Sequence, residues 1–169
     1  MPKIRNMRRT IALTAAALAA TGISLGTAGT AHAAAADCTV INIGSPGTLT
    51  ISYNNQEIGQ VEQQYQVCGG VDETRAHYQW ASVFENGNPN AEVYVAAYGS
   101  GGGINSSYDA YASQGQNVYS NWVDIHSSNP DTWQASVTLM TDSNCEATGS
   151  WHAYANGGNS GGSGNVPCN

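Results

Sequence analysis

Asp124 and His126 are the two residues whose types and spacing come nearest to acid–base chemistry. A carboxylate beside an imidazole can form a general-base pair or contribute to a metal site. Residues two positions apart on a strand are separated by roughly 7 Å, too far for a direct hydrogen bond unless the side chains lean together. No serine stands in the sequence context of a nucleophile elbow. We therefore predict a polar strand end that faces water, and we assign no catalytic residue.

Two further sets of side chains carry atoms that could ligate a metal. His77, His126 and His152 lie far apart in the sequence and lack the spacing typical of metal ligands. Oxygen-bearing side chains alternate between Glu85 and Glu92, but calcium loops favour several carboxylates and a glycine at the sharp turn. The sequence therefore predicts neither a metal site nor a cofactor.

His32 offers a more specific possibility. Cleavage after Ala31 would expose a histidine amino terminus, which resembles the copper-binding end of copper-dependent polysaccharide monooxygenases. This resemblance implies a copper enzyme built on a β-sandwich. Ala31-His32-Ala33 is the better cleavage site, and cleavage after Ala33 removes the histidine.

The aromatic residues are the remaining candidates for binding, since all nine Tyr and four Trp lie after residue 33. Sugar rings stack on exposed aromatic rings, while Asn, Gln and Asp side chains bind the hydroxyl groups. Alternatively, a core poor in Leu and Phe uses its aromatic residues inside, as we expect for Trp133. The predicted ligand-binding residues are Tyr94, Tyr98, Tyr108, Tyr111 and Trp122.

Residues 1–33 have the organisation of a secretory signal peptide. Four basic residues precede the apolar run 11–20, and the A-x-A site at 31–33 follows. We expect cleavage after Ala33, with Ala36 and Ala31 as alternatives, by the Sec or the twin-arginine route. The prediction is a cleaved signal peptide over 1–33 and one secreted, extracellular β domain over 34–169.

The charge of residues 34–169 excludes two classes of partner. Arg75 is the only Lys or Arg in this range, which also contains twelve acidic residues. The net charge of the range is therefore −11 with neutral His. Nucleic acids and anionic membranes both need clustered basic side chains. We therefore expect an extracellular glycan or a protein as the partner, with no nucleic acid and no membrane.

The four cysteines are an even set in a chain with an export signal, so disulfides are the expected use. Three connectivities are open. We favour Cys38–Cys68 with Cys145–Cys168, because the second bridge would close the flexible segment 156–165 and hold the C-terminal tail.

Alternating side chains organise the fold around residues 132–140. One row, Trp133, Ala135, Val137 and Leu139, is apolar and the other is polar, which is the pattern of a half-buried strand. Further strands are predicted, as separate elements, at 39–43, 48–53, 60–67, 75–84, 93–98, 108–112, 117–126 and 147–155. Gln60, Glu62, Gln64 and Gln66 are expected to form a solvated row, and Asn86-Gly87 a hairpin turn.

Eight or nine strands and no helix predict an all-β domain, an antiparallel β-sandwich or a small barrel held by disulfides. The leading functional hypothesis is a small secreted domain that binds a polysaccharide or cell-wall glycan. A protein-binding module such as a protease inhibitor is the first alternative, because a disulfide can support an exposed loop. The second alternative is a small extracellular hydrolase or copper enzyme whose site assembles only in the folded chain.

Overall fold

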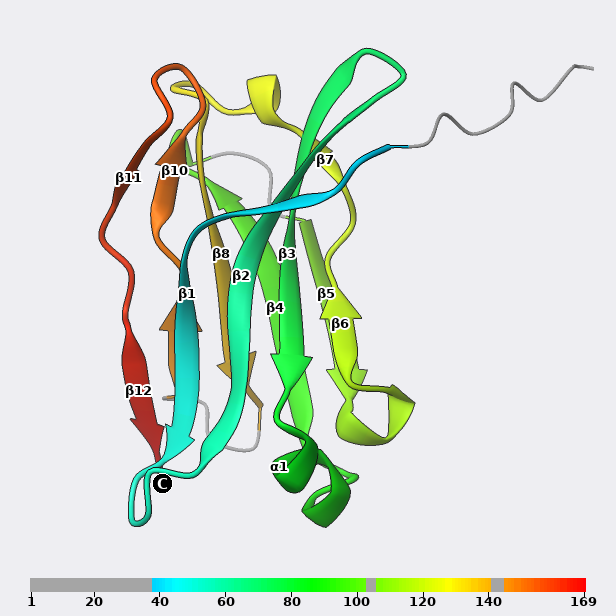
Figure 1. Cartoon of the computed structure of the whole chain (residues 1–169), viewed down its shortest axis with the longest axis vertical. Helices are drawn as coiled ribbons and strands as arrows, with labels where there is room; N and C mark the ends of the chain where they lie inside the picture. Colours follow the sequence, from blue (N-terminus) through cyan, green and yellow to red (C-terminus); the bar gives the residue numbers. More distant parts are fainter. Residues whose placement is uncertain (1–37, 103–105, 141–144) are drawn as a thin grey trace, which may run out of the picture. The chain divides into compact units, whose positions relative to one another are not determined.

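Two β-sheets packed face to face form the domain (Figure 1), so the predicted all-β sandwich is confirmed and the barrel alternative is not. The computed structural model describes residues 38–102, 106–140 and 145–169. The predicted signal peptide, with His32 and its cleavage sites, lies outside the described residues. No described helix is long and apolar enough to cross a membrane.

Each sheet contains six strands. Sheet A has the order β12 (Asn165–Cys168), β1 (Ile41–Ile51), β2 (Glu57–Cys68), β3 (Val71–Trp80) and β6 (Asn117–Tyr119), and β7 (Val123–Asp124) also pairs with β3. Sheet B has the order β11 (Gly158–Ser160), β10 (Trp151–Ala153), β8 (Thr132–Leu139), β4 (Glu92–Gly99) and β5 (Ser106–Tyr111), and β9 (Glu146–Thr148) also pairs with β8. Neighbouring strands are antiparallel except β1 and β12, which are parallel.

The predicted organising strand is confirmed as β8, which lies inside sheet B between β4 and the short strands β9 and β10. Its apolar row is buried, and Trp133 has no exposed surface. The Trp133 Nε1–H donates to the Ile125 carbonyl at 2.8 Å, which satisfies the one polar atom that the indole carries into the core. The polar row is only partly exposed, because Ser136 is fully buried on the outer face.

The N-terminal part was predicted wrongly as two strands joined by a turn. Residues 41–51 form the single strand β1, and the pairing with β2 shifts register between Ile43 and Gly47. Gly44 takes a positive φ of 76° at this irregularity. A Cβ atom at Gly47 would collide with the Thr148 carbonyl of the opposite sheet. The glycines therefore bend one strand and do not separate two.

The row of glutamines on β2 is not solvated, contrary to our prediction. Gln64 and Gln66 are 8% and 6% exposed, Glu62 is half-buried, and only Gln60 is exposed. Their amides bind neighbouring strands: Gln66 Nε2 donates to Glu73 Oε2 at 2.7 Å, and Gln64 Nε2 donates to Asn42 Oδ1 at 3.0 Å. Cross-strand partners of this kind allow polar side chains to be buried.

Two connections also differ from the prediction. The strand expected over 75–84 ends at Trp80, and helix α1 (Ser82–Gly87) follows, so Asn86-Gly87 closes a helix and not a hairpin. The segment expected as one strand over 117–126 is divided into β6, β7 and the 3-10 turn η2 (Ile125–Ser127). A second 3-10 turn, η1 (Ala112–Gln114), joins β5 to β6.

Both favoured disulfides are present. Cys38–Cys68 joins the start of the described chain to the end of β2. Cys145–Cys168 joins the residue before β9 in sheet B to the end of β12 in sheet A, so it links the two sheets. The segment 156–165, which we predicted to be a flexible loop, contains β11 and the first residue of β12.

Candidate functional site

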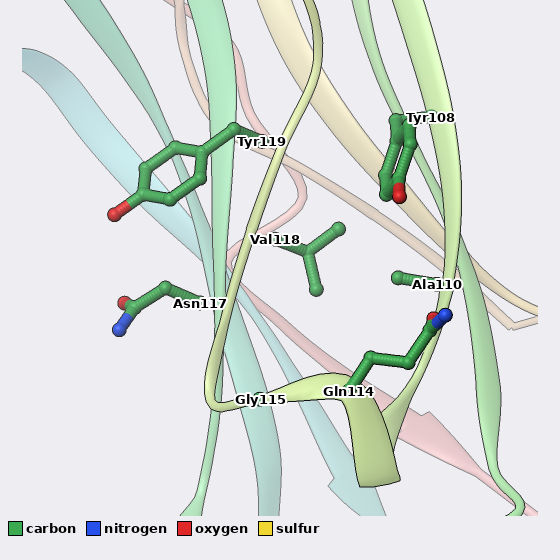
Figure 2. Close-up of a pocket in the computed structure, with 7 residues that line it drawn as sticks. All are labelled: Tyr108, Ala110, Gln114, Gly115, Asn117, Val118 and Tyr119. Carbon is green, nitrogen blue, oxygen red and sulfur yellow. The ribbon is translucent and has the colours of Figure 1, made fainter.

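An open cleft lies between the edge strands of the two sheets. Strand β5 ends sheet B and strand β6 ends sheet A, and the turn η1 connects them. The cleft has a volume of about 300 Å³ and is lined by Tyr108, Ala110, Gln114, Gly115, Asn117, Val118 and Tyr119 (Figure 2). Its residues come from one continuous stretch of twelve positions, which the η1 turn folds back on itself.

The floor of the cleft is apolar and one wall carries an exposed aromatic ring. Ala110 and Val118 are 4% and 3% exposed and belong to the core. Figure 2 shows Val118 pointing towards Ala110 and the ring of Tyr108. Tyr108 is 52% exposed, although its partner in register, Val95, is buried in the core. The ring therefore projects on the inner side of β5, where the sandwich is open.

The opposite wall is provided by the free edge of β6. Ser120 N donates to Ala76 O, and Trp80 N donates to Gln116 O, both towards β3. Main-chain groups of successive residues on an antiparallel strand point to alternate edges. The N–H and C=O groups of Asn117 and Tyr119 therefore face the cleft, while their side chains lie on the other side of β6 from Val118 (Figure 2).

Gln114 adds a side-chain amide at the closed end. Its Oε1 accepts a hydrogen bond of 2.7 Å from the Tyr111 amide, which fixes the side chain over the η1 turn. Within the described residues, the Nε2 group of Gln114 makes no hydrogen bond. The cleft thus combines one aromatic ring, an apolar floor, a fixed amide donor and free main-chain groups.

A polar network covers the outer face of sheet A directly beside this cleft. His77 is its centre and is 8% exposed. Nδ1 of His77 lies 2.9 Å from Glu62 Oε1, and Nε2 lies 2.9 Å from Asn117 Oδ1. The ring also stacks on Tyr119, with centroids 4.7 Å apart and an interplanar angle of 11°. One buried histidine therefore contacts two residues that line the cleft, Asn117 and Tyr119, from the outer face of sheet A.

Arg75 continues this network through two aromatic rings. Its Cζ atom lies 4.0 Å from the centre of the Tyr119 ring and 4.3 Å from that of Trp122. Its Nε–H donates to Gln64 Oε1 at 2.9 Å. Burial lowers the pKa of the Arg75 guanidinium, because removal of water disfavours the charged form. The two ring faces compensate in part through cation–π attraction.

The structure does not bring the five predicted binding residues together. Tyr108 lines the cleft, whereas Trp122 packs against Arg75 outside it. Tyr94 and Tyr98 are half-buried on the outer face of sheet B, where burial raises the pKa of Tyr98. Tyr111 is in register with Glu92 on that same face and is 45% exposed.

His126 has a carboxylate partner, but this partner is not Asp124. Nδ1 of His126 lies 2.7 Å from Asp131 Oδ2, while Asp124 Oδ1 accepts from the main-chain N–H of His126. The side chain of His126 is 63% exposed and that of Asp131 is 30% exposed. No group of three or more His, Cys, Asp or Glu side chains suited to a metal ion occurs in the part of the chain that the structure describes.

Our sequence interpretation missed Gln114, Asn117, Tyr119 and the support that His77 gives. Their roles depend on β6 being an edge strand and on its register with β3, neither of which alternation of side chains reveals. The local signal was present in Gln114-Gly115, where Gly115 takes a φ of 132° and reverses the chain between β5 and β6. A turn at this glycine would have placed Tyr108 near Tyr119.

Comparison of the chain with protein-family models, with curated proteins and with solved structures finds no match.

Proposed function

We propose that the protein is a secreted domain that binds a polysaccharide or cell-wall glycan in the cleft between β5 and β6. The observation that carries this proposal is the ring of Tyr108, which is 52% exposed above an apolar floor. Beside it lie main-chain groups of β6 that have no hydrogen-bond partner among the described residues. An aromatic residue in such a place leaves apolar area in contact with water that a ligand could cover.

The chemistry of the cleft matches the two kinds of surface on a sugar. The C–H face of a pyranose can stack on Tyr108, and the floor formed by Ala110 and Val118 suits the same apolar face. Ring hydroxyl groups can meet Gln114 Nε2 and the main-chain groups of β6. A volume of about 300 Å³ is at the lower end for small-molecule sites, so it suits a short segment of a chain.

The free edge of β6 also suggests how a longer glycan would lie. A sugar in the cleft is separated from Asn117 and the ring of Tyr119 only by the strand itself. Tyr119 is 38% exposed, and Asn117 is exposed as well. A glycan that crosses β6 would thus have its next contacts on the outer face of sheet A.

Binding to insoluble chitin, cellulose, xylan and peptidoglycan tests the proposal, with Trp fluorescence as a second readout. Tyr108→Ala is expected to reduce the affinity by about tenfold or more, since exposed aromatic anchors dominate such sites. Tyr111→Ala is the matched control, because it removes a tyrosine of similar exposure, 45% against 52%, from the other face of the same strand. Equal binding by both variants would move the site away from the cleft.

A second candidate is protein binding by the hairpin between β2 and β3, which lies at one end of the sandwich (Figure 1). Val67 and Val71 flank its Gly69-Gly70 turn and are 52% and 43% exposed. The Cys38–Cys68 disulfide holds the hairpin next to its turn, because Cys68 directly precedes Gly69. A rigid loop that presents apolar side chains is typical of protease inhibitors. Inhibition of a panel of extracellular proteases, abolished by Val67→Asp, would support this function over glycan binding.

A further inference from the structure

The outer face of sheet A contains one cation that has no carboxylate partner. Arg75 is the only Lys or Arg after residue 33. Its side chain contacts Gln64, Tyr119 and Trp122, and no carboxylate of the described residues lies within 4.0 Å of it. In a domain with a large excess of acidic residues, a lone cation without an ion pair requires an explanation.

The neighbouring acids are already bound elsewhere. Glu62 Oε1 lies 2.9 Å from His77 Nδ1, and Glu73 Oε2 accepts from Gln66 at 2.7 Å. Asp124 Oδ1 accepts from the His126 main-chain N–H at 2.8 Å. Strand register places these three residues on the same face as Arg75, yet each makes its hydrogen-bond contact with another group.

The guanidinium is also fixed and only partly covered. The Nε–H bond to Gln64 and the two aromatic rings hold its plane, while the side chain as a whole stays half-exposed. In the described part of the molecule, its Nη groups donate to no acceptor. Two parallel N–H groups in this geometry match the two oxygens of one carboxylate.

We propose that Arg75 is a subsite for the carboxylate of an acidic sugar, a uronic acid or a lactyl-substituted sugar, adjacent to the cleft. This subsite rests on the proposed function, because Tyr119 links the two: it lines the cleft and also contacts the guanidinium. A glycan that crosses β6 from the cleft would bring a ring substituent to Arg75.

The acids around Arg75 restrict which anions can bind. A carboxylate at Arg75 gains one direct ion pair. Every further negative charge on the ligand is repelled by Glu62, Glu73 and Asp124 or by the negative net charge of the domain. The subsite therefore favours sugars with a single, isolated carboxylate over polyuronates.

The test is a titration of the whole mature chain with D-glucuronate and with its uncharged methyl ester, at 0.15 M NaCl and followed by NMR. Glucuronate is expected to shift the Arg75 Nε–H and Trp122 indole resonances saturably, with an affinity about three- to tenfold above that of the ester. Arg75→Gln should remove this preference, and Arg75→Lys should restore only part of it, because a point charge cannot bind both oxygens.

The controls separate this inference from the proposed function. Equal shifts with acid and ester, or a preference that persists in Arg75→Gln, would overturn the carboxylate subsite. A neutral oligosaccharide such as chitotetraose tests the cleft by itself, through resonances of Tyr108 and Gln114. Absence of those shifts would contradict glycan binding in the cleft. The carboxylate subsite at Arg75 is tested separately, by the glucuronate titration.

Discussion

Nε2 of His77 lies 2.9 Å from Oδ1 of Asn117, and this contact joins the buried network of sheet A to the rim of the cleft. Because the other ring nitrogen lies 2.9 Å from Glu62 Oε1, the imidazole is held at both ends. In the structure the Asn117 side chain directs its Oδ1 towards His77, and its Nδ2 points away from the ring. In this orientation the Asn117 amide is a preset donor for a hydroxyl group, and it loses little side-chain freedom on binding.

Asn117→Ala is expected to weaken glycan binding about three- to tenfold, in keeping with the loss of one hydrogen bond to a ligand. His77→Ala should weaken it less, because the donor remains but is no longer oriented. Gln79→Ala is the matched control, since Gln79 is an exposed amide in register with Asn117 on the same face. Isothermal titration with the best glycan of the binding panel measures all three. Equal losses in the Gln79 and Asn117 variants would contradict a specific role for Asn117.

The inner row of β8 should dominate stability. Val137 is fully buried between the sheets, so Val137→Ala is expected to lower the free energy of unfolding by about 1.5–3 kcal/mol, from lost transfer energy and the cavity left behind. Val83→Ala makes the same chemical change at a residue that is 74% exposed on α1, and it should stay within about 0.5 kcal/mol of the parent. Chemical denaturation measures both, and similar values for the two variants would refute the assignment of the core.

How far the sequence determines this fold can be judged from β8 and β2. Alternation in 132–140 identified the buried row correctly, because successive side chains of a strand in a sandwich point alternately to the core and to the outer face. The same reasoning failed for Gln64 and Gln66, which are polar and yet buried. Their burial depends on amide partners across the sheet, and those partners follow from strand register, which periodicity does not determine.

In the candidate site, too, the sequence indicated one residue that lines the cleft but did not predict the placement of its neighbours. Tyr108 was predicted as a binding residue from its type and its place near a glycine-rich stretch, and it does line the cleft. Tyr111, three positions later and of the same type, lies on the opposite face of β5. A count of exposed aromatic residues cannot separate the two. Tyr108 differs from Tyr111 because it lies on the inner side of β5. Sheet A ends at β6, so no further strand of the described chain covers that side at Tyr108.

Asp131 is expected to control the titration of His126. The hydrogen bond to its carboxylate raises the pKa of the His126 imidazole above the ordinary value of 6.5, because it stabilises the charged form. A raised pKa in the folded state means that the pair stabilises the fold fully below the unfolded value, and that this contribution is lost as pH rises through the folded value. Asp131→Asn should therefore lower the pKa of His126 back towards 6.5, as seen by NMR of the ring Cε1–H.

Asp124→Asn is the control for that titration. Asp124 acts on His126 only through a weaker Coulomb attraction, and its hydrogen bond goes to the main chain. The pKa of His126 should fall less in this variant than in Asp131→Asn. An unchanged pKa in Asp131→Asn would show that the pair does not persist in solution.

The two disulfides should differ in what they stabilise. Cys145 and Cys168 are 1% and 3% exposed and link the two sheets, whereas Cys38 and Cys68 are half-buried and lie at one end of sheet A. Both bridges close loops of similar length, with sequence separations of 30 and 23, so the effect on the unfolded chain is similar, about 3 kcal/mol each. Replacing Cys145 and Cys168 by Ala should cost more than replacing the other pair, because it also removes buried contacts between β9 and β12. Urea denaturation of the two double variants measures the loss in the free energy of unfolding. A larger loss for the Cys38–Cys68 variant would contradict this expectation. It would mean that the β2–β3 end limits the stability of the fold, and not the contact between the sheets.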